Sequence, residues 1–465
     1  MLPGKMFRGK VRCIHFVGIG GSGMCGIAEV LLTLGFRITG SDLKEGPVPA
    51  RLRALGAEVH IGHGAGNLGD ADVVVKSTAV SDTNPEVRAA QARGVPVIPR
   101  AEMLAELMRM KLGVAVAGTH GKTTTTSMLA KVLAVAGLDP TIVIGGRLDA
   151  IGSNARLGQG EFLVAEADES DGSFMMLAPT VALITNIDPE HLDHYGSFEA
   201  LRETFVAFGN KVPFYGFTVA CLDHPVVQDI LPSLRKRLVT YGLSRQADYR
   251  GDELHFSGLE TSFQVQRRGE ILGEIHLGLP GVHNVRNALA AAATAMELDI
   301  PFEQVRDGLR GFTGVQRRFT VVGEAGGVMV VDDYGHHPEE IRATLRGARD
   351  GFGERRIVAV FQPHRFSRAK DLHSEFCRAF NLADHVVVCP IYAAGEAPIV
   401  GVDHSSLGEG LRAHGHRSVQ VADSLEQALE HLLISARPGD IVIMLGAGNV
   451  NSLCAPLVRA LEPTA

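Results

Sequence analysis

The clearest chemical signature in the sequence is one short segment, Gly118-Thr119-His120-Gly121-Lys122-Thr123-Thr124. It follows an apolar run, Val114 to Val116, and precedes a helix-like stretch from Met128 to Val135. Glycines after a strand leave backbone N–H groups free for phosphate, while lysine and threonine supply a positive charge and a hydroxyl for polyphosphate and Mg²⁺. Val116 occupies the place of the first glycine of the full phosphate-loop pattern. We therefore expect a shorter relative of that loop and a nucleoside triphosphate site.

A second glycine-rich loop follows the first strand, and its candidate binding residues are Gly20, Gly21, Ser22 and Gly23. Asp42 stands at the end of the next expected strand. This spacing fits a dinucleotide fingerprint, in which glycines approach a pyrophosphate and the acid binds a ribose hydroxyl. A nucleoside diphosphate sugar satisfies the pattern as well as NAD does. Glycines that merely form a tight turn are the structural alternative.

Acidic and histidine residues follow two further strands. The run Ala165-Glu166-Ala167-Asp168-Glu169-Ser170-Asp171 comes after Phe162 to Val164, and His191 lies in a loop beyond Val181 to Ile184. Carboxylates at the carboxyl end of parallel strands can hold Mg²⁺ or its waters. Four acids in six residues cannot all face one ion, so we expect about half of them to be solvated or to cap the next helix. For His191, a structural role and a metal or phosphate role remain equally open.

Three other polar groups could bind ligands. Asn284 and Asn287, which follow His283, can share one face of an alanine-rich helix and offer amides to a base edge, or can be a helix cap and a solvated side chain. Two loops, Asp332 to Pro338 and Gln362 to Arg368, end successive strands of one expected parallel sheet. They contain tyrosine, histidines and two arginines, the residue types that orient a carboxylate or a phosphate.

The elements that position these residues alternate as strands and helices, which predicts an α/β protein of three blocks. Period-two alternation between Asp248 and Leu279 predicts antiparallel hairpins within the second block. The chain of 465 residues is long enough for about three domains. A net charge of −7 argues against nucleic-acid binding, and apolar runs far below ~18 residues argue against a membrane span. Six scattered cysteines favour reduced core residues in a cytoplasmic protein.

Taken together, the motifs resemble the Mur ligase family of peptidoglycan synthesis over essentially the whole chain. The resemblance implies a Rossmann-like domain at 1–110 for a UDP sugar, a central phosphate-loop ATPase domain at 111–318 and a Rossmann-like domain at 319–465. It implies ATP and Mg²⁺ as cofactors. Lys122 would contact the phosphates, and Thr123, Glu166 and His191 would hold the metal. The other implied contacts are His283, Asn284, Asn287, Arg318 and Asp333 with ATP, Ser22, Asp42, His63 and Ser77 with UDP, and Tyr334, His336, Arg365 and Arg368 near the amino acid.

One difference from other members of the family indicates which reaction to expect. Later ligases of the pathway carry a lysine shortly after the metal histidine, whereas Ser197 to Thr204 contains Arg202 and no lysine. This agrees with the member that adds L-alanine to the carboxylate of UDP-N-acetylmuramate through an acyl phosphate, acting as a monomer or weak homodimer.

Three alternatives remain. A recycling ligase that attaches a whole tripeptide ranks second, because its first glycine loop typically differs. An NAD-dependent oxidoreductase would explain only that first loop. A nucleotide-sugar sensor without catalysis would leave the histidine and arginine loops of the third block without a role.

Overall fold

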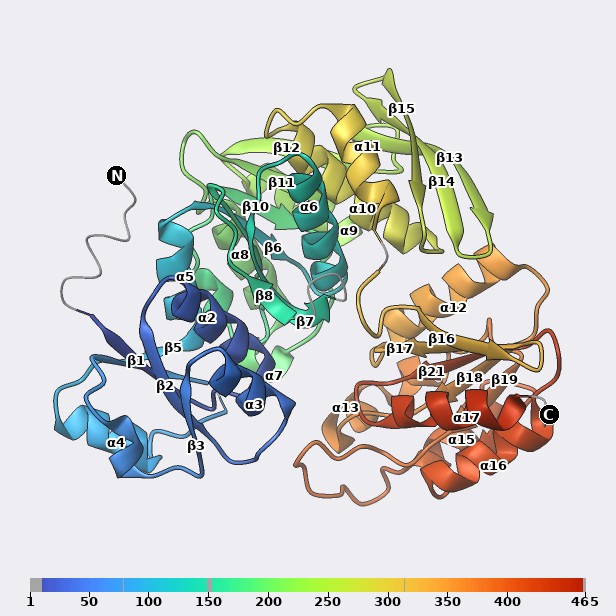
Figure 1. Ribbon diagram of the computed structural model, residues 1–465. Coiled ribbons are helices and arrows are strands. Elements are labelled where there is room, and N and C mark those ends of the chain that lie inside the picture. Colours follow the sequence, from blue (N-terminus) through green and yellow to red (C-terminus); the bar gives the residue numbers. More distant parts are fainter. Residues whose placement is uncertain (1–10, 78, 149–152, 313, 463–465) are drawn as a thin grey trace. The chain divides into compact units, whose positions relative to one another are not determined.

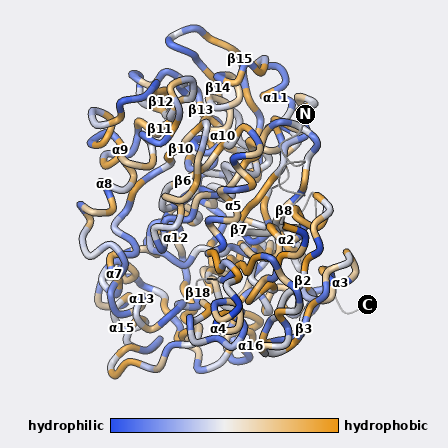
Figure 2. The backbone as a smooth tube through the Cα atoms, turned by 90° about the vertical axis from the view of Figure 1, so that its left-hand side faces the viewer, coloured by the Kyte–Doolittle hydropathy of each residue, from blue (hydrophilic) through white to orange (hydrophobic). Residues whose placement is uncertain are grey.

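The computed structural model describes residues 11–77, 79–148, 153–312 and 314–462. Within these ranges the strands form three separate sheets, and the chain divides into two compact units (Figure 1). The first unit contains residues 1–252, 264–275 and 286–312, and the second contains 253–263, 276–285 and 313–465. Hydrophobic and hydrophilic stretches alternate along the backbone, as expected of layered α/β structure (Figure 2).

The amino-terminal sheet has five parallel strands in the order β3-β2-β1-β4-β5. The order reverses between β1 and β4, which is where open α/β sheets bind ligands. The loops after these two strands are neighbours, because a Cβ atom on Gly18 would lie 3.4 Å from Cβ of Ser77. The strands are β1 (Cys13–Val17), β2 (Arg37–Asp42), β3 (Glu58–Ile61), β4 (Val73–Lys76) and β5 (Val97–Pro99), and the helices are α2 (Ser22–Thr33), α3 (Pro47–Ala54), η1 (Ala65–Leu68), α4 (Pro85–Ala92) and α5 (Arg100–Arg109).

The central sheet has ten strands in the order β15-β14-β13-β12-β11-β10-β6-β9-β7-β8. Its middle is parallel, with β6 between β10 and β9, so the loops after these three strands leave the same edge. The strands are β6 (Leu112–Ala117), β7 (Thr141–Leu148), β8 (Ser153–Arg156), β9 (Phe162–Glu166), β10 (Val181–Ile184), β11 (Phe217–Cys221), β12 (Arg237–Gly242), β13 (Tyr249–Ser257), β14 (Glu260–Arg267) and β15 (Glu270–Leu277). Two-residue turns join β13 to β14 and β14 to β15, which only antiparallel neighbours allow, as predicted.

The helical segments of this central region include α6, which begins at Lys122 itself, six residues before the expected helix-like stretch. Their bounds are α6 (Lys122–Val135), η2 (Ser173–Met176), α7 (Leu192–Tyr195), α8 (Phe198–Gly209), α9 (Pro225–Ile230), η3 (Leu231–Ser233), α10 (Val282–Met296) and α11 (Phe302–Arg310).

The carboxyl-terminal sheet has the order β16-β17-β21-β18-β19-β20 and is buried on both faces. In β18, Ile357, Ala359 and Phe361 face one core and Val358 and Val360 face the other, which explains why this strand is a continuous apolar run. Two strands have weaker sequence signals than the rest of this sheet, β16 (Thr320–Ala325) and β20 (Val419–Val421). Strand β16 is antiparallel to β17. The others are β17 (Val328–Asp333), β18 (Ile357–Phe361), β19 (His385–Val388) and β21 (Ile441–Leu445).

The helices of this region are α12 (Pro338–Phe352), α13 (Phe366–Asp371), α14 (His373–Phe376), α15 (His404–Ala413), α16 (Leu425–Ser435), η4 (Val450–Leu453) and α17 (Cys454–Leu461). The loops after β17 and β18 leave one edge, as predicted, since both strands run parallel to β21. None of the six cysteines of the chain, all of which lie in the described ranges, forms a disulfide, and all six are buried, which confirms that they are core residues. No helix in the described ranges combines the length and the apolar character needed to cross a membrane.

Candidate functional site

The phosphate-type loop connects β6 directly to α6. Gly118 and Gly121 have φ angles of +132° and +82°, which favour glycine. Gly121 is the N-cap residue of α6 and has no side chain that could cap the helix. The N–H groups of the first helical turn are therefore open to an anion, and the helix dipole favours negative charge there.

Asn287 of α10 packs against this loop within the first unit. Its side-chain oxygen accepts a hydrogen bond from the Thr125 hydroxyl at 3.2 Å. A Cβ atom on Gly121 would lie 2.6 Å from the same oxygen. Asn284, one turn earlier, donates its amide to the carbonyl of Pro280 at 2.8 Å. Both asparagines are buried, so the alternative of a solvated side chain is wrong.

Lys122 is held by an acid and by the loop itself. Its Nζ lies 2.9 Å from Oε2 of Glu169 and donates to the carbonyls of Gly118 at 2.6 Å and Thr119 at 3.0 Å. Burial opposes the charge of Lys122, but the carboxylates of Glu169 and Glu166 outweigh it and hold the lysine pKa above its usual range. Burial likewise raises the pKa of Glu169. A positive charge is thus fixed at the start of α6.

The side chains of Thr123 and Glu166, two of the predicted metal ligands, are in contact. The Thr123 hydroxyl lies 3.1 Å and 3.0 Å from the two carboxylate oxygens of Glu166. Of the other acids in this run, Asp171 accepts from the backbone N–H of Ser173 at 3.0 Å, at the start of η2. Asp171 therefore bonds within its own turn, which accounts for one of the four acids in this run.

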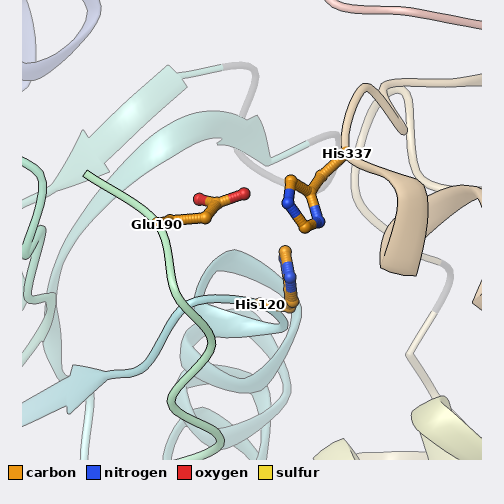
Figure 3. Close-up of side chains that lie close together, drawn as sticks. All are labelled: His120, Glu190 and His337. Carbon is orange, nitrogen blue, oxygen red and sulfur yellow. The ribbon is translucent and has the colours of Figure 1, made fainter. Parts of the chain in front are cut away.

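The loop after β10 adds histidine and further acids. His191 is the N-cap residue of α7, has a φ of +57°, and its Nε2 lies 3.5 Å from Glu190. Figure 3 shows Glu190 and His120 of this unit with their side chains directed toward the same space. Nε2 of His120 also lies 3.5 Å from a carboxylate oxygen of Asp188. His120 and His191, which lie on the loops after β6 and β10, are thus both beside acids of the loop after β10.

Thr185 and Asn186, directly after β10, hold the phosphate-type loop by hydrogen bonds. We did not predict this role from the sequence. The Asn186 side chain accepts from the backbone N–H of His120 at 2.7 Å and donates to its carbonyl at 3.0 Å. The Thr185 hydroxyl donates to the same carbonyl at 2.7 Å. A polar pair directly after a buried strand was the available sequence signal.

Asp42 contacts the glycine loop of the amino-terminal sheet directly, whereas the fingerprint has this acid bind a ribose hydroxyl. The backbone N–H of Gly20 donates to Oδ2 of Asp42 at 2.8 Å, and a Cβ on Gly20 would lie 2.7 Å from that oxygen. The side chain of Ser22 lies outside the described part of the structure. His63 contacts the Ser41 hydroxyl through Nδ1 at 2.9 Å. Asp42 is the last residue of β2, and His63 and Ser77 follow β3 and β4, all at one edge of this sheet.

Aromatic and cationic side chains gather at the carboxyl edge of the third sheet. The Arg317 and Arg318 guanidinium carbons lie 4.9 Å and 5.6 Å from the ring centre of Tyr334. The Tyr334 ring contacts the His336 ring edge-on at 5.3 Å between centroids. Arg318 also pairs with Glu340 at 3.1 Å. The predicted Tyr334 and His336 therefore belong to one cluster with Arg318.

His364 extends this cluster to the predicted arginines. Its ring stacks on Tyr392 at 5.6 Å and meets His336 at 6.0 Å, and its Nδ1 lies 3.4 Å from Arg368. Burial, together with the charges of His336 and Arg368, lowers the pKa of His364 to about 4. Arg365 is exposed at the N-cap of α13, with a φ of +68°.

Asp333 is buried beneath this cluster and serves as a backbone anchor. Its carboxylate accepts from the backbone N–H groups of Phe319 and Gly335, each at 2.8 Å. Arg317, which we did not single out, donates to the carbonyls of Gly446 at 2.5 Å and Gly448 at 3.4 Å. Glycines after the apolar strand β21 were the sequence signal for this third loop.

Comparison with known proteins shows which family this chain belongs to. The family models described as "Mur ligase family, catalytic domain", "Mur ligase middle domain" and "Mur ligase, glutamate ligase domain" match residues 13–112, 116–295 and 317–448. A UDP-N-acetylmuramate--L-alanine ligase of Geobacter sp. (strain M21) is 59% identical, with 95% of this chain and 96% of the relative covered. The chain belongs to the Mur ligase family.

Solved structures of Mur ligases share the whole architecture. The UDP-N-acetylmuramate-alanine ligase MurC from Thermotoga maritima matches with a TM-score of 0.81 at 32% identity, covering 97% of this chain and 98% of that one. The murein peptide ligase from Psychrobacter arcticus matches with a TM-score of 0.69 at 25% identity, covering 98% and 99%. The expected three-domain α/β Mur ligase fold is confirmed.

Proposed function

We propose that this Mur ligase joins L-alanine to the carboxylate of UDP-N-acetylmuramate, with conversion of ATP to ADP and phosphate, in the synthesis of peptidoglycan precursors. The observation that carries the proposal is the 59% identity, over nearly the full length of both chains, to a ligase named for these two substrates. Membership of the family excludes the oxidoreductase and the sensor. The tripeptide recycling ligase is second, since two solved peptide ligases match this chain with TM-scores of 0.69 and 0.61, below the 0.81 of the L-alanine ligase.

The loop from Gly118 to Thr124 would bind the ATP phosphates. Lys122 carries its charge at the beginning of α6, and the glycines leave backbone donors open. We assign His283, Asn284 and Asn287 to the adenine, and we also assign Arg318 and Asp333 to the nucleotide. The position of Asn287 against Gly121 supports its part of this assignment.

The donor set near this loop fits Mg²⁺. A threonine hydroxyl and a carboxylate, Thr123 and Glu166, lie within 3.1 Å of each other, and Mg²⁺ prefers hard oxygen ligands. We propose these two residues and His191 as ligands or as holders of bound water. When bound, the ion would neutralise charge on the phosphate oxygens.

The carboxylate of UDP-N-acetylmuramate must be activated before the amine of L-alanine can add to it. The muramate carboxylate attacks the γ-phosphorus of ATP, which breaks the bond to ADP and gives an acyl phosphate. The deprotonated amine of L-alanine then adds to the acyl carbon, and phosphate leaves the tetrahedral intermediate. Phosphoryl transfer depends on alignment and charge stabilisation more than on covalent catalysis, which is the part that we assign to Lys122.

The amino acid would bind at the aromatic and cationic cluster of the third sheet. Arginine matches a carboxylate through two parallel N–H donors. We propose Arg365 or Arg368 for the alanine carboxylate, with Tyr334 and His336 beside it. The first glycine loop, with Asp42, His63 and Ser77, would bind UDP.

Three further proposals concern the domain boundaries, the cellular location and the oligomeric state. We propose domains at 1–110, 111–318 and 319–465, and the family-model limits support these boundaries. Six buried cysteines without disulfides support a cytoplasmic location. We further propose that the enzyme is a monomer or weak homodimer.

One assay tests the reaction. Phosphate release from ATP should require UDP-N-acetylmuramate and L-alanine together, and the product should gain one alanine residue by mass. Release with the sugar acid and a tripeptide, but not with L-alanine, would instead identify the recycling ligase. Release without any amino acid would contradict ligation.

A further inference from the structure

A buried polar cluster lies beside the proposed UDP loops of the amino-terminal sheet. It centres on Glu86 in α4, whose side chain is fully buried. The carboxylate accepts hydrogen bonds from the Ser41 hydroxyl at 2.5 Å, the Asn67 amide at 2.6 Å and the Gly64 backbone N–H at 3.1 Å. The His15 ring contacts it at 3.4 Å. Glu86 thus joins β1, the end of β2 and the segment after β3.

Glu86 is an obligatory acceptor at neutral pH. Burial opposes its ionisation, but hydrogen bonds from His15, Ser41 and Asn67 outweigh burial and lower the pKa of Glu86 to about 2. An ionised carboxylate has no hydrogen to donate. The single hydroxyl hydrogen of Ser41 must therefore point toward Glu86.

This orientation determines the state of His63. Nδ1 of His63 lies 2.9 Å from the Ser41 oxygen, whose hydrogen is already committed. Ser41 can only accept in this contact, so Nδ1 of His63 carries a hydrogen. In the neutral ring Nε2 then presents a lone pair. Among the described residues, the contacts of the His63 ring are with Ser41 and Glu86, both through Nδ1, and Nε2 is left for a ligand.

We propose that Glu86, acting through Ser41, sets His63 as a hydrogen-bond acceptor for a donor group on the uridine part of the UDP sugar. This inference rests on the proposed function. A uridine nucleotide offers two kinds of donor, the N3–H of uracil and the hydroxyls of ribose. Cytosine has a lone pair at N3, so an acceptor at His63 would also disfavour cytidine nucleotides if the contact is to the base. Glu86 is a positioning residue in this scheme, and His63 is the residue that touches the ligand.

The test measures binding of UDP, CDP, 2′-deoxy-UDP and 3′-deoxy-UDP to the full chain by calorimetry. The wild-type protein should bind at least one of the three analogues about 10-fold more weakly than UDP, the size expected for one buried hydrogen bond. Loss with CDP identifies the base as the donor, and loss with a deoxy analogue identifies ribose.

The Glu86→Gln variant tests whether Glu86 acts on His63 through Ser41 or only supports the local structure. The new amide can donate to Ser41, which would then donate to Nδ1 of His63 and move the ring hydrogen to Nε2. The variant should therefore bind UDP and the analogue that the wild type binds more weakly with nearly equal affinity. Asn67→Ala is the matched control, because it removes another hydrogen bond to Glu86 and leaves Ser41 and His63 in place. It should keep the wild-type preference.

Ser41→Ala interrupts the same relay without altering Glu86 and replaces Glu86→Gln if that variant does not fold. The proposal is overturned if these variants keep the full preference for UDP, if Asn67→Ala loses it equally, or if the wild type binds all four nucleotides alike. Failure of the wild type to bind UDP at all would instead contradict the proposed UDP site.

Discussion

Lys122 and Glu169 form a buried ion pair, 2.9 Å between Nζ and Oε2, directly at the first turn of α6. The lysine also donates to two carbonyls of its own loop, so its ammonium group is held by three neighbouring oxygen-bearing groups. A phosphate group that binds to this helix start must compete with the Glu169 carboxylate for the ammonium group.

Lys122→Ala should lower turnover by roughly 10² or more, because it removes a charge directed at the transferring phosphoryl group. Phosphate release under saturating substrates measures the effect, and circular dichroism checks the fold. A folded variant with near-normal turnover would show that this loop does not bind ATP.

Glu166→Gln should raise the Mg²⁺ concentration needed for half-maximal activity, since a carboxylate ligand becomes a neutral amide. His191→Ala should act in the same direction. Asp171→Asn is the control, because Asp171 accepts from the Ser173 backbone within its own loop. Equal Mg²⁺ dependence in all these proteins would assign Glu166 and His191 structural roles.

Replacing Arg365 or Arg368 by Lys should identify the residue that binds the alanine carboxylate. Lysine keeps the charge but loses the fork of donors, so the KM for L-alanine should rise much more than the KM for ATP. Alaninamide, which lacks the carboxylate, should be used equally poorly by that variant and the wild type. A parallel rise of both KM values would indicate a phosphate contact.

His364 should make the protein less stable in mild acid. Its pKa is lowered to about 4 in the folded state, against about 6.5 for an unperturbed histidine. Between these values the unfolded chain binds a proton that the folded chain does not, so stability is lost as the pH falls from about 6.5 toward 4. His364→Phe keeps an aromatic ring beside Tyr392 but cannot titrate.

The Tm of His364→Phe should therefore fall less than that of the wild type between pH 7 and pH 5. His255→Gln, at an exposed position of β13, serves as the control and should follow the wild type. Identical slopes for all three proteins would show that His364 does not contribute to the acid sensitivity.

The sequence was sufficient to predict the strands and loops that carry most candidate residues, because buried parallel strands are apolar runs and their ends are marked by glycines and polar residues. It correctly predicted that the loops from Asp332 to Pro338 and from Gln362 to Arg368 share an edge. Contacts distant along the chain were not predictable from local patterns. Glu169 was one acid among four, and nothing local distinguishes it as the partner of Lys122.

The polar cluster around Glu86 was missed for the same reason. Its members come from β1, β2, the segment after β3 and α4, and each is an ordinary polar residue in its own stretch of sequence. Arg317 also carried no signal, since its partners at Gly446 and Gly448 are about 130 residues away. Only the fold shows that these groups are buried together.

The contact between Thr125 and Asn287 has a consequence for how the protein is made. The two residues are separated by 162 positions, and the intervening chain contains most of the central sheet and its hairpins. During synthesis, β6 and the start of α6 leave the ribosome long before α10 exists, since translation adds about 5–20 residues per second. For several seconds or longer, the nascent phosphate-type loop therefore lacks its contact with Asn287, which can form only after α10 has been synthesised.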